Sequence, residues 1–321
     1  MSAELTVAPR PSDRRIMVAW ISLACLWGTT WLAIRIGLDD LPPFTFAGTR
    51  FALAAALVGA LLVFRIRRRR RSGAGDTPFG AIDPTPSEWR RLLAAGVQVF
   101  AVGYGLQFWG QQFVPSGLVA IVYSTVPAVG MIFARLRVGE PVTPQRAFGL
   151  GAGIAGVSLI SYGQIQGGGA MVTQGMLAFV VSVLCYGNAS VTVRSLGARL
   201  DPLFITMVQM SLGAVALLGA GFALEGSISV NWTPTAMGAM AWLVIAGSAL
   251  AFYLLYWLLR YLETTKVLSV LLADPLIALT LGWAWFGEAL GSIETAGAVL
   301  VLGGLYLVLS AGGSGQDAAA T

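Results

Sequence analysis

The chain has 321 residues, of which 56% are hydrophobic and only 11% are charged, and its 20 basic and 15 acidic side chains give a net charge of +5. Soluble domains carry about 25% charged residues, so this composition excludes a soluble globular domain and indicates a polytopic membrane protein. The sequence has no histidine and two cysteines, Cys25 and Cys185, which excludes histidine-based nucleophile pairs, haem ligation by histidine and the usual zinc sites.

Ten apolar stretches are long enough to cross the hydrocarbon core of a bilayer, which takes roughly 20 residues. In chain order they lie at 16–36, 42–64, 90–112, 117–136, 144–162, 174–194, 202–222, 237–261, 266–286 and 291–311. Residues 1–15 form an N-terminal tail, and residues 311–321 form a tail without a packing signal that we predict to be disordered. The sequence therefore predicts an all-α integral membrane protein with ten transmembrane helices.

The distribution of arginine predicts the orientation of these helices, because Lys and Arg in short loops mark the cytoplasmic side. With a cytoplasmic N-terminus, 18 of the 20 basic residues fall in inside segments, and only Arg35 and Arg50 do not. The run Arg65–Arg71 follows the second stretch directly. This position fits a topology anchor better than a nucleic-acid site. Each arginine of such an anchor gains about 1 kcal/mol from the attraction of anionic lipid headgroups. Both termini are predicted to be cytoplasmic, in a cell membrane.

The two halves of the chain, residues 16–163 and 173–310, resemble each other in sequence. Matched pairs, at an offset of 159 residues and later of 148 residues, include Trp27 with Tyr186, Arg35 with Arg194, Trp109 with Trp257, and Glu140 with Glu288. Each half holds five stretches, and an odd number forces the second half to insert upside down. This predicts two inverted-topology five-helix repeats, an architecture of secondary transporters. Because both halves keep the Gly-Glu turns, we expect a structural role for their carboxylates.

Several short motifs recur in a fixed order along the chain. They are Trp27-Gly28-Thr29-Thr30 with Arg35, Pro42-Pro43 with Arg50-Phe51, Pro115-Ser116-Gly117, and the paired turns Gly139-Glu140 and Gly287-Glu288. With these motifs the sequence resembles the EamA-type branch of the drug/metabolite transporter superfamily over roughly residues 16–310. The resemblance implies ten helices, cytoplasmic termini, a central cavity lined by helices 1–4 and 6–9, and proton-driven export of a small metabolite, amino acid or drug. It does not fix the substrate.

Two ionisable residues lie deep within predicted spans, where a charge is expensive and marks a functional candidate. Arg50 lies about eight residues from the outer end of the second span and Asp274 about eight residues from the inner end of the ninth, each roughly 12 Å deep. Their repeat counterparts are the neutral residues Gln209 and Val126, so these charges are not part of the duplicated architecture. We expect Asp274 to take a proton or a substrate ammonium and Arg50 to be able to pair with it. The alternative is a structural ion pair that locks the two spans together.

The remaining predicted substrate contacts are aromatic and amide side chains within other spans: Trp27, Tyr104, Gln107, Asn188 and Tyr253. An aromatic-lined cavity with a few amides suits an amphipathic organic solute, which it would bind by stacking and directed hydrogen bonds. Packing roles and positions in an interfacial aromatic belt are the competing interpretation for such residues.

The functional prediction is a secondary active transporter, a proton-coupled exporter of a small organic metabolite that works by alternating access. The alternative is an uncoupled facilitator or channel. An enzyme is not expected, since histidine is missing and only one carboxylate lies deep in a span, and a primary pump would need a G-x-x-x-x-G-K-[ST] loop that the sequence lacks. No cofactor or metal is expected. The expected partners are the solute, protons and membrane lipids but no nucleic acid, and the chain is expected to be a monomer or a weak homodimer.

Overall fold

The computed structural model describes residues 11–72, 80–114, 119, 122–161, 170–226, 230–274, 276–277 and 292–311. Within these residues the protein is a bundle of helices without a β-strand, and one isolated β-bridge joins Ala81 to Leu200. Six of the described helices are long and apolar enough to cross a membrane, and Thr295–Ser310 is a shorter apolar helix. The prediction of an all-α membrane protein is therefore confirmed.

The helices follow the apolar stretches in order. The first half contains α1 (Asp13–Leu38), α2 (Pro43–Ser72), α3 (Pro86–Gly96), the π-helix η1 (Val97–Gly103), α4 (Tyr104–Gly110), α6 (Val126–Val138) and α7 (Pro144–Ser161). The second half contains α8 (Ala170–Gly197), α9 (Pro202–Leu224), α10 (Pro234–Trp242), the π-helix η3 (Leu243–Leu250), α11 (Ala251–Tyr261), α12 (Thr264–Leu268), the 3-10 helix η4 (Ser269–Leu272) and α14 (Ser292–Ser310).

Three of the long helical segments begin with the same local chemistry. Thr85, Asp201 and Thr233 are the N-cap residues of α3, α9 and α10, and each side chain accepts a hydrogen bond from a backbone N–H in the first turn. A proline follows each cap, and proline fits the first turn because it lacks the N–H that would otherwise stay unpaired there. Cap and proline together fix where these helices start.

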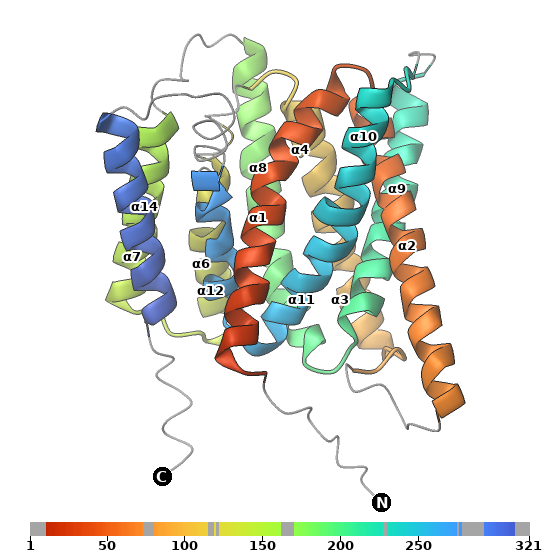
Figure 1. Ribbon diagram of the computed structural model, residues 1–321, viewed down its shortest axis with the longest axis horizontal. Coiled ribbons are helices and arrows are strands. Elements are labelled where there is room, and N and C mark those ends of the chain that lie inside the picture. Colours follow the sequence, from red (N-terminus) through yellow and green to blue (C-terminus); the bar gives the residue numbers. More distant parts are fainter. Residues whose placement is uncertain are drawn as a thin grey trace, which may run out of the picture.

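α2 is longer than predicted, because the helix does not stop before the arginine run. Its 30 residues continue to Ser72, where the predicted span ends at residue 64. At 1.5 Å per residue the helix is about 45 Å long, which exceeds a hydrocarbon core of ~30 Å. Arginine is a good helix former, so the run Arg65–Arg71 extends the helix beyond the rest of the bundle (Figure 1).

The third and eighth predicted spans are continuous helices, Pro86–Gly110 and Pro234–Tyr261, and each contains a π-helical segment in its middle. A π-turn fits an extra residue into the helix and is frequent at functional sites. The ninth predicted span, 266–286, is described only in its first half. There it passes from α12 into the 3-10 helix η4 just before Asp274.

The helices form antiparallel pairs at the two edges of the bundle, α7 with α14 and α2 with α9 (Figure 1). Glycines permit the first pairing. A Cβ atom on Gly149 would lie 2.8 Å from the carbonyl oxygen of Gly304, and one on Gly156 would lie 2.6 Å from that of Gly297. The small-residue faces of the predicted fifth and tenth spans therefore pack against each other within the chain.

The α2–α9 pair is joined at both ends by acidic side chains. Glu225, at the end of α9, accepts hydrogen bonds from the backbone N–H groups of Phe44 (2.6 Å) and Thr45 (2.9 Å) in the first turn of α2. A carboxylate at this position also interacts favourably with the helix dipole. At the other end, Arg65 of α2 forms an ion pair with Asp201, the N-cap of α9.

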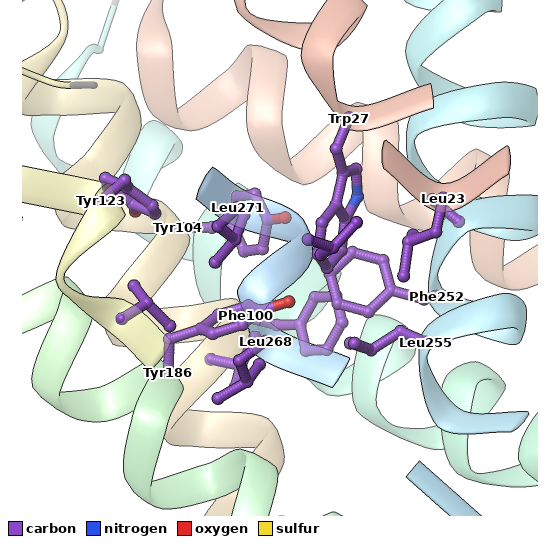
Figure 2. Packing of buried hydrophobic residues seen from close by; sticks show 14 of the residues in the cluster. Leu23, Trp27, Phe100, Tyr104, Tyr123, Tyr186, Phe252, Leu255, Leu268 and Leu271 are labelled. Carbon is purple, nitrogen blue, oxygen red and sulfur yellow. The ribbon is translucent and has the colours of Figure 1, made fainter. Parts of the chain in front are cut away.

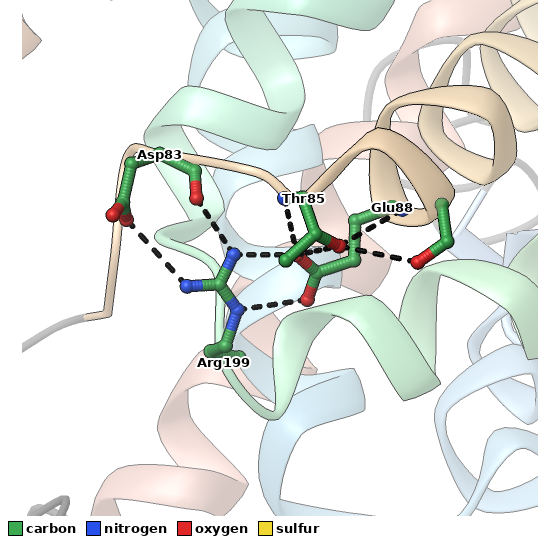
Figure 3. Close-up of polar contacts among 5 residues, drawn as sticks. Asp83, Thr85, Glu88 and Arg199 are labelled. Atoms are coloured by element: carbon green, nitrogen blue, oxygen red, sulfur yellow. Dashed lines mark hydrogen bonds and ion pairs between the residues drawn. The ribbon is translucent and has the colours of Figure 1, made fainter.

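α1 begins and α14 ends on the same side of the bundle, which we call the terminal face (Figure 1). The segment before α3 docks here on the turn between α8 and α9 through Arg199 (Figure 3). Arg199 Nε donates to Glu88 (2.8 Å), and Nη2 donates to the carbonyl oxygen of Asp83 (2.7 Å). Glu88 also completes the capping box with Thr85. The described residues just before α3 and the start of that helix are thus fixed to the second half of the chain.

Candidate functional site

A small cavity lies inside the bundle, lined by residues of α1, α2, α4 and α8, by Leu271 of η4, by Asp274, and by Tyr123 just before α6. Its volume of about 30 Å³ is room for about two water molecules. An organic solute can therefore bind only after the surrounding side chains or helices have moved apart.

Five of the seven residues predicted from the sequence line this one cavity: Trp27, Arg50, Tyr104, Gln107 and Asp274. They are distant in sequence and come from four separate helical segments. Their convergence is a property of the fold, since no local pattern in the sequence brings them together.

The other two predicted residues, Asn188 and Tyr253, are not among those that line this cavity. Asn188 Nδ2 donates to Gln98 Oε1 (2.8 Å), and its Oδ1 accepts from Arg137 Nη1 (2.7 Å), so its amide joins α8 to η1 and α6. Tyr253 is half-buried on α11. The structure therefore assigns Asn188 a contact between helices and gives Tyr253 no place at the cavity.

Arg50 is 1% exposed, and η3 holds two edges of its guanidinium group. Nε donates to Ser248 Oγ (2.7 Å), and Nη2 donates to the carbonyl oxygen of Gly247 (3.0 Å). Gly247 must lack a side chain here, because a Cβ atom would lie 2.7 Å from Cγ2 of Thr30 and 3.3 Å from Arg50 Nη2. These two hydrogen bonds to the π-helix thus fix the orientation of the guanidinium plane. The third nitrogen, Nη1, takes no part in them.

Three aromatic rings surround the same guanidinium group. Its central carbon lies 5.1 Å from the ring centroid of Phe51, 5.4 Å from that of Tyr104 and 5.9 Å from that of Phe108. Cation–π attraction is worth about 2 kcal/mol or more when the partners are desolvated. The rings therefore offset part of the cost of burying the charge without neutralising it.

Asp274 is the second buried charge at the cavity, and it is 6% exposed. Its Oδ2 accepts a hydrogen bond from Trp31 Nε1 (3.4 Å), whereas its Oδ1 has no hydrogen-bond partner. The expected ion pair between Asp274 and Arg50 is not present among the described residues. The reason is local, because Ser248 and Gly247 already hold two edges of the arginine on another helix.

Four buried polar atoms on the cavity lining have no hydrogen-bond partner: Trp27 Nε1, Arg50 Nη1, Tyr186 Oη and Asp274 Oδ1. Each such atom costs about 1–3 kcal/mol when it stays unpaired. The set combines donors, an acceptor and a hydroxyl that can be either. A cavity with this lining complements a polar ligand or water.

The opposite wall of the cavity is a hydrogen-bonded chain. Tyr123 Oη donates to Gln107 Oε1 (2.7 Å) and lies 2.8 Å from Ser182 Oγ, and Ser182 donates to the carbonyl oxygen of Gly103 (2.9 Å). Sequence analysis did not select Tyr123 or Ser182. It also missed Tyr186, although the repeat alignment with Trp27 was a signal that could have found it.

On one side the cavity ends in a layer of aromatic rings. The ring of Phe252 lies 4.8 Å from that of Phe100 and 5.7 Å from that of Trp27, measured between centroids (Figure 2). Phe100 precedes Tyr104 by one turn in a helix that starts at the terminal face, so this layer lies between the cavity and that face. We call Phe100 and Phe252 the aromatic floor.

The repeat counterpart of Arg50 shows what the same position does without a charge. Gln209 is fully buried, its Nε2 donates to the carbonyl oxygen of Leu92 (3.3 Å), and its Oε1 accepts from Tyr256 Oη. Both ends of this amide are therefore satisfied by the protein. Arg50 differs because its Nη1 makes no hydrogen bond of normal geometry, although Tyr104 lies close enough to interact with the guanidinium group.

The apolar helices define a multi-pass membrane protein, and a polar cavity lies inside its bundle. The sequence model of the EamA-like transporter family matches residues 15–162 and 173–310, and the chain belongs to this family. It is therefore a membrane transporter, and the resemblance noted from the motifs is confirmed.

Relatives of known name are also described as transporters. The chain is 30% identical over 288 residues to the uncharacterized inner membrane transporter YedA of Escherichia coli (strain K12), with 86% of this chain and 84% of YedA covered. It is 25% identical over 294 residues to the uncharacterized transporter YoaV of Bacillus subtilis (strain 168), covering 91% and 96% of the two chains. It is 25% identical over 301 residues to a probable terminal-alkyne amino-acid exporter of Streptantibioticus cattleyicolor, covering 88% and 89%.

The fold occurs in a solved crystal structure as well. The two chains superpose with a TM-score of 0.73, over 92% of this chain and 96% of the other. Their sequence identity is 18%, so this likeness concerns the fold alone.

Proposed function

We propose that this protein is a secondary active exporter, coupled to protons, of a small organic solute that carries both a carboxylate and an ammonium group. The observation that carries the proposal is the buried cavity in which four polar atoms, on Trp27, Arg50, Tyr186 and Asp274, have no partner. A protein without a ligand for them would gain stability by replacing such groups with apolar ones.

The two buried charges support the choice of solute. Arg50 and Asp274 have opposite signs, line one cavity and are not paired with each other. A solute carboxylate suits Arg50 Nη1, a solute ammonium suits Asp274 Oδ1, and the rings of Trp27 and Tyr104 suit its apolar part. The name of the Streptantibioticus cattleyicolor relative, an amino-acid exporter, points to the same class of solute.

Asp274 is the candidate for proton coupling. Burying an ionised carboxylate without a cation is costly, and either a proton or an ammonium group relieves that cost. Proton and solute then compete for one carboxylate, so solute leaves the site as a proton enters it. The chain has no histidine to take this role.

Alternating access between two inverted five-helix repeats, residues 16–163 and 173–310, is the proposed mechanism. The helix contacts support it, because exchanging each span for its repeat counterpart reproduces the same pairings. α2 packs on its counterpart α9, and α7 packs on α14. The contact of α1 with α10 and α11 corresponds to that of α8 with α3 and α4, and η1 and η3 occupy the centres of corresponding spans. In the proposed topology of ten helices, the terminal face is cytoplasmic.

Flux into proteoliposomes tests the function, with three solutes that differ only in their charged groups. We expect transport of L-phenylalanine, accelerated by a pH gradient, and little transport of phenethylamine or 3-phenylpropionate, which each lack one charge. Other zwitterionic amino acids, with side chains from alanine to tryptophan, extend the panel. Transport that ignores the pH gradient would indicate an uncoupled facilitator. Transport of the single-charge solutes at the rate of the zwitterions would overturn the two-charge site.

A further inference from the structure

Glu140 lies outside the cavity, and its side chain joins α6, α8 and α12, which either carry a cavity-lining residue or lie next to one in the chain. It follows Gly139, whose φ of +73° is left-handed and turns the chain at the end of α6. The side chain returns into the bundle, where the residue is only 8% exposed. Its carboxylate forms an ion pair with Arg194 of α8 and accepts a hydrogen bond from Oγ1 of Thr264, the first residue of α12 (3.2 Å).

The same three segments meet again at the cavity. Tyr123 immediately precedes α6, Tyr186 belongs to α8, and Asp274 follows η4, which continues α12. A solute that moved between the cavity and the terminal face along these helices would have to separate them at the level of Glu140.

Close backbone packing seals the space between the two levels. A Cβ atom on Gly130 of α6 would lie 2.4 Å from Leu268 of α12, and one on Gly187 of α8 would lie 2.7 Å from Val129 of α6. These contacts and the aromatic floor lie between the cavity and the terminal face in the described part of the chain. Apolar contacts of this kind are not directional and can slide, whereas an ion pair with a hydrogen bond has to break before its partners separate.

The other ion pairs of the terminal face join different elements. Arg146 of α7 pairs with Glu263, Arg65 of α2 pairs with Asp201, and Arg199 pairs with Glu88 of α3. The Glu140 carboxylate connects α6, α8 and α12 at once, and Glu263, the N-cap of α12, interacts electrostatically with the same Arg194.

We infer that Glu140 is a gating residue: its contacts with Arg194 and Thr264 hold the exit to the terminal face shut, and they break when the cavity opens to that face. The inference rests on the proposed alternating access, but it concerns the protein without solute. It assigns the carboxylate of this Gly-Glu turn a role beyond the structural one expected from its duplication.

The test uses a cysteine reporter at the cavity. Thr30 lines the cavity and is 6% exposed, so Thr30→Cys in a Cys25→Ser/Cys185→Ser background places a single thiol there. Its labelling by a membrane-impermeant methanethiosulfonate is timed in inside-out and right-side-out vesicles without solute. We expect Glu140→Gln to raise the labelling rate from the terminal face by about tenfold or more, the shift that loss of a charge-assisted hydrogen bond produces.

Glu88→Gln is the matched control, because it removes a carboxylate from an ion pair of the same face that does not join these helices, and we expect no change in labelling. The exchange Glu140→Arg/Arg194→Glu should return the labelling rate toward that of the parent.

If Glu140→Gln does not fold, as judged by size-exclusion chromatography, Thr264→Val must raise the labelling rate in the same direction by a smaller factor. The gate would be overturned if Glu140→Gln folds and its labelling from the terminal face is unchanged. If Glu140→Gln does not fold, the same result with folded Thr264→Val would overturn it. Because labelling needs no solute, failure to transport any zwitterionic amino acid of the panel would overturn the proposed function and leave the gate intact.

Discussion

Replacing Asp274 by asparagine separates its charge from its shape. Asparagine has the same size and can still accept the hydrogen bond from Trp31 Nε1, which Asp274 Oδ2 accepts at 3.4 Å. The substitution removes the negative charge and the ability to take a proton. A hydrogen bond to a charged group is worth about 1.5–3 kcal/mol. At 1.4 kcal/mol per factor of ten, apparent affinity for a solute ammonium should therefore fall by about 10- to 100-fold.

The coupling effect is sharper than the affinity effect. In proteoliposomes, Asp274→Asn should abolish the acceleration of L-phenylalanine transport by a pH gradient, so that rates with and without the gradient become equal. Asp40→Asn serves as the control, since Asp40 lies between α1 and α2, bonds to Thr233 and does not line the cavity. It should leave both rates unchanged. A folded Asp274→Asn protein that still responds to the pH gradient would refute the assignment of the proton to this carboxylate.

Three further predictions concern the arginine and the helix packing. Arg50→Gln reproduces the residue at its repeat counterpart, Gln209, and should remove the preference for L-phenylalanine over phenethylamine in competition assays, because the carboxylate loses its partner. Ser248→Ala removes the acceptor of Arg50 Nε and should raise the apparent KM for L-phenylalanine by roughly tenfold. Ser248→Thr keeps a hydroxyl at this position and should restore the KM. An unchanged KM in Ser248→Ala would argue against positioning of Arg50 by η3. Gly304→Val should lower the melting temperature seen by size-exclusion thermostability assays, since a Cβ atom would lie 2.5 Å from the carbonyl oxygen of Gly149, and an unchanged value would contradict close packing of α7 on α14.

The sequence predicted the six described long apolar helices and the two buried charges for simple physical reasons. A span needs a fixed number of apolar residues, and a charge inside one stands out against that background. Arg50 and Asp274 could therefore be selected without any knowledge of the packing. Their lack of direct pairing could not be foreseen, because the partners that hold Arg50, Gly247 and Ser248, lie in a distant span and carry no recognisable motif.

Which face of a helix points inward was harder to predict. A π-turn adds a residue and rotates everything after it by about 100° relative to a regular helix. Tyr253 follows η3 and is not among the residues that line this cavity, whereas its neighbour Phe252 packs on Trp27 and Phe100, so a role of Tyr253 in solute binding stays a prediction. Asn188 lies on a regular helix, and the sequence could not show that Gln98 and Arg137, distant in sequence, bond to both ends of its amide, so its role in solute binding stays a prediction.

The pairing of α2 with α9 bears on how the transmembrane voltage acts on transport. Bonds from Glu225 at one end and between Arg65 and Asp201 at the other make the pair a rigid unit, and Arg50 is built into it. A charge on a rigid unit moves through the field only when the whole unit moves, whereas Asp274 lies just after η4, where the α-helix gives way to a 3-10 helix. Exchange of a zwitterion for one proton then moves a single net charge per cycle. The membrane potential would contribute about 2.3 kcal/mol per 100 mV, so export should run faster when the cytoplasm is negative.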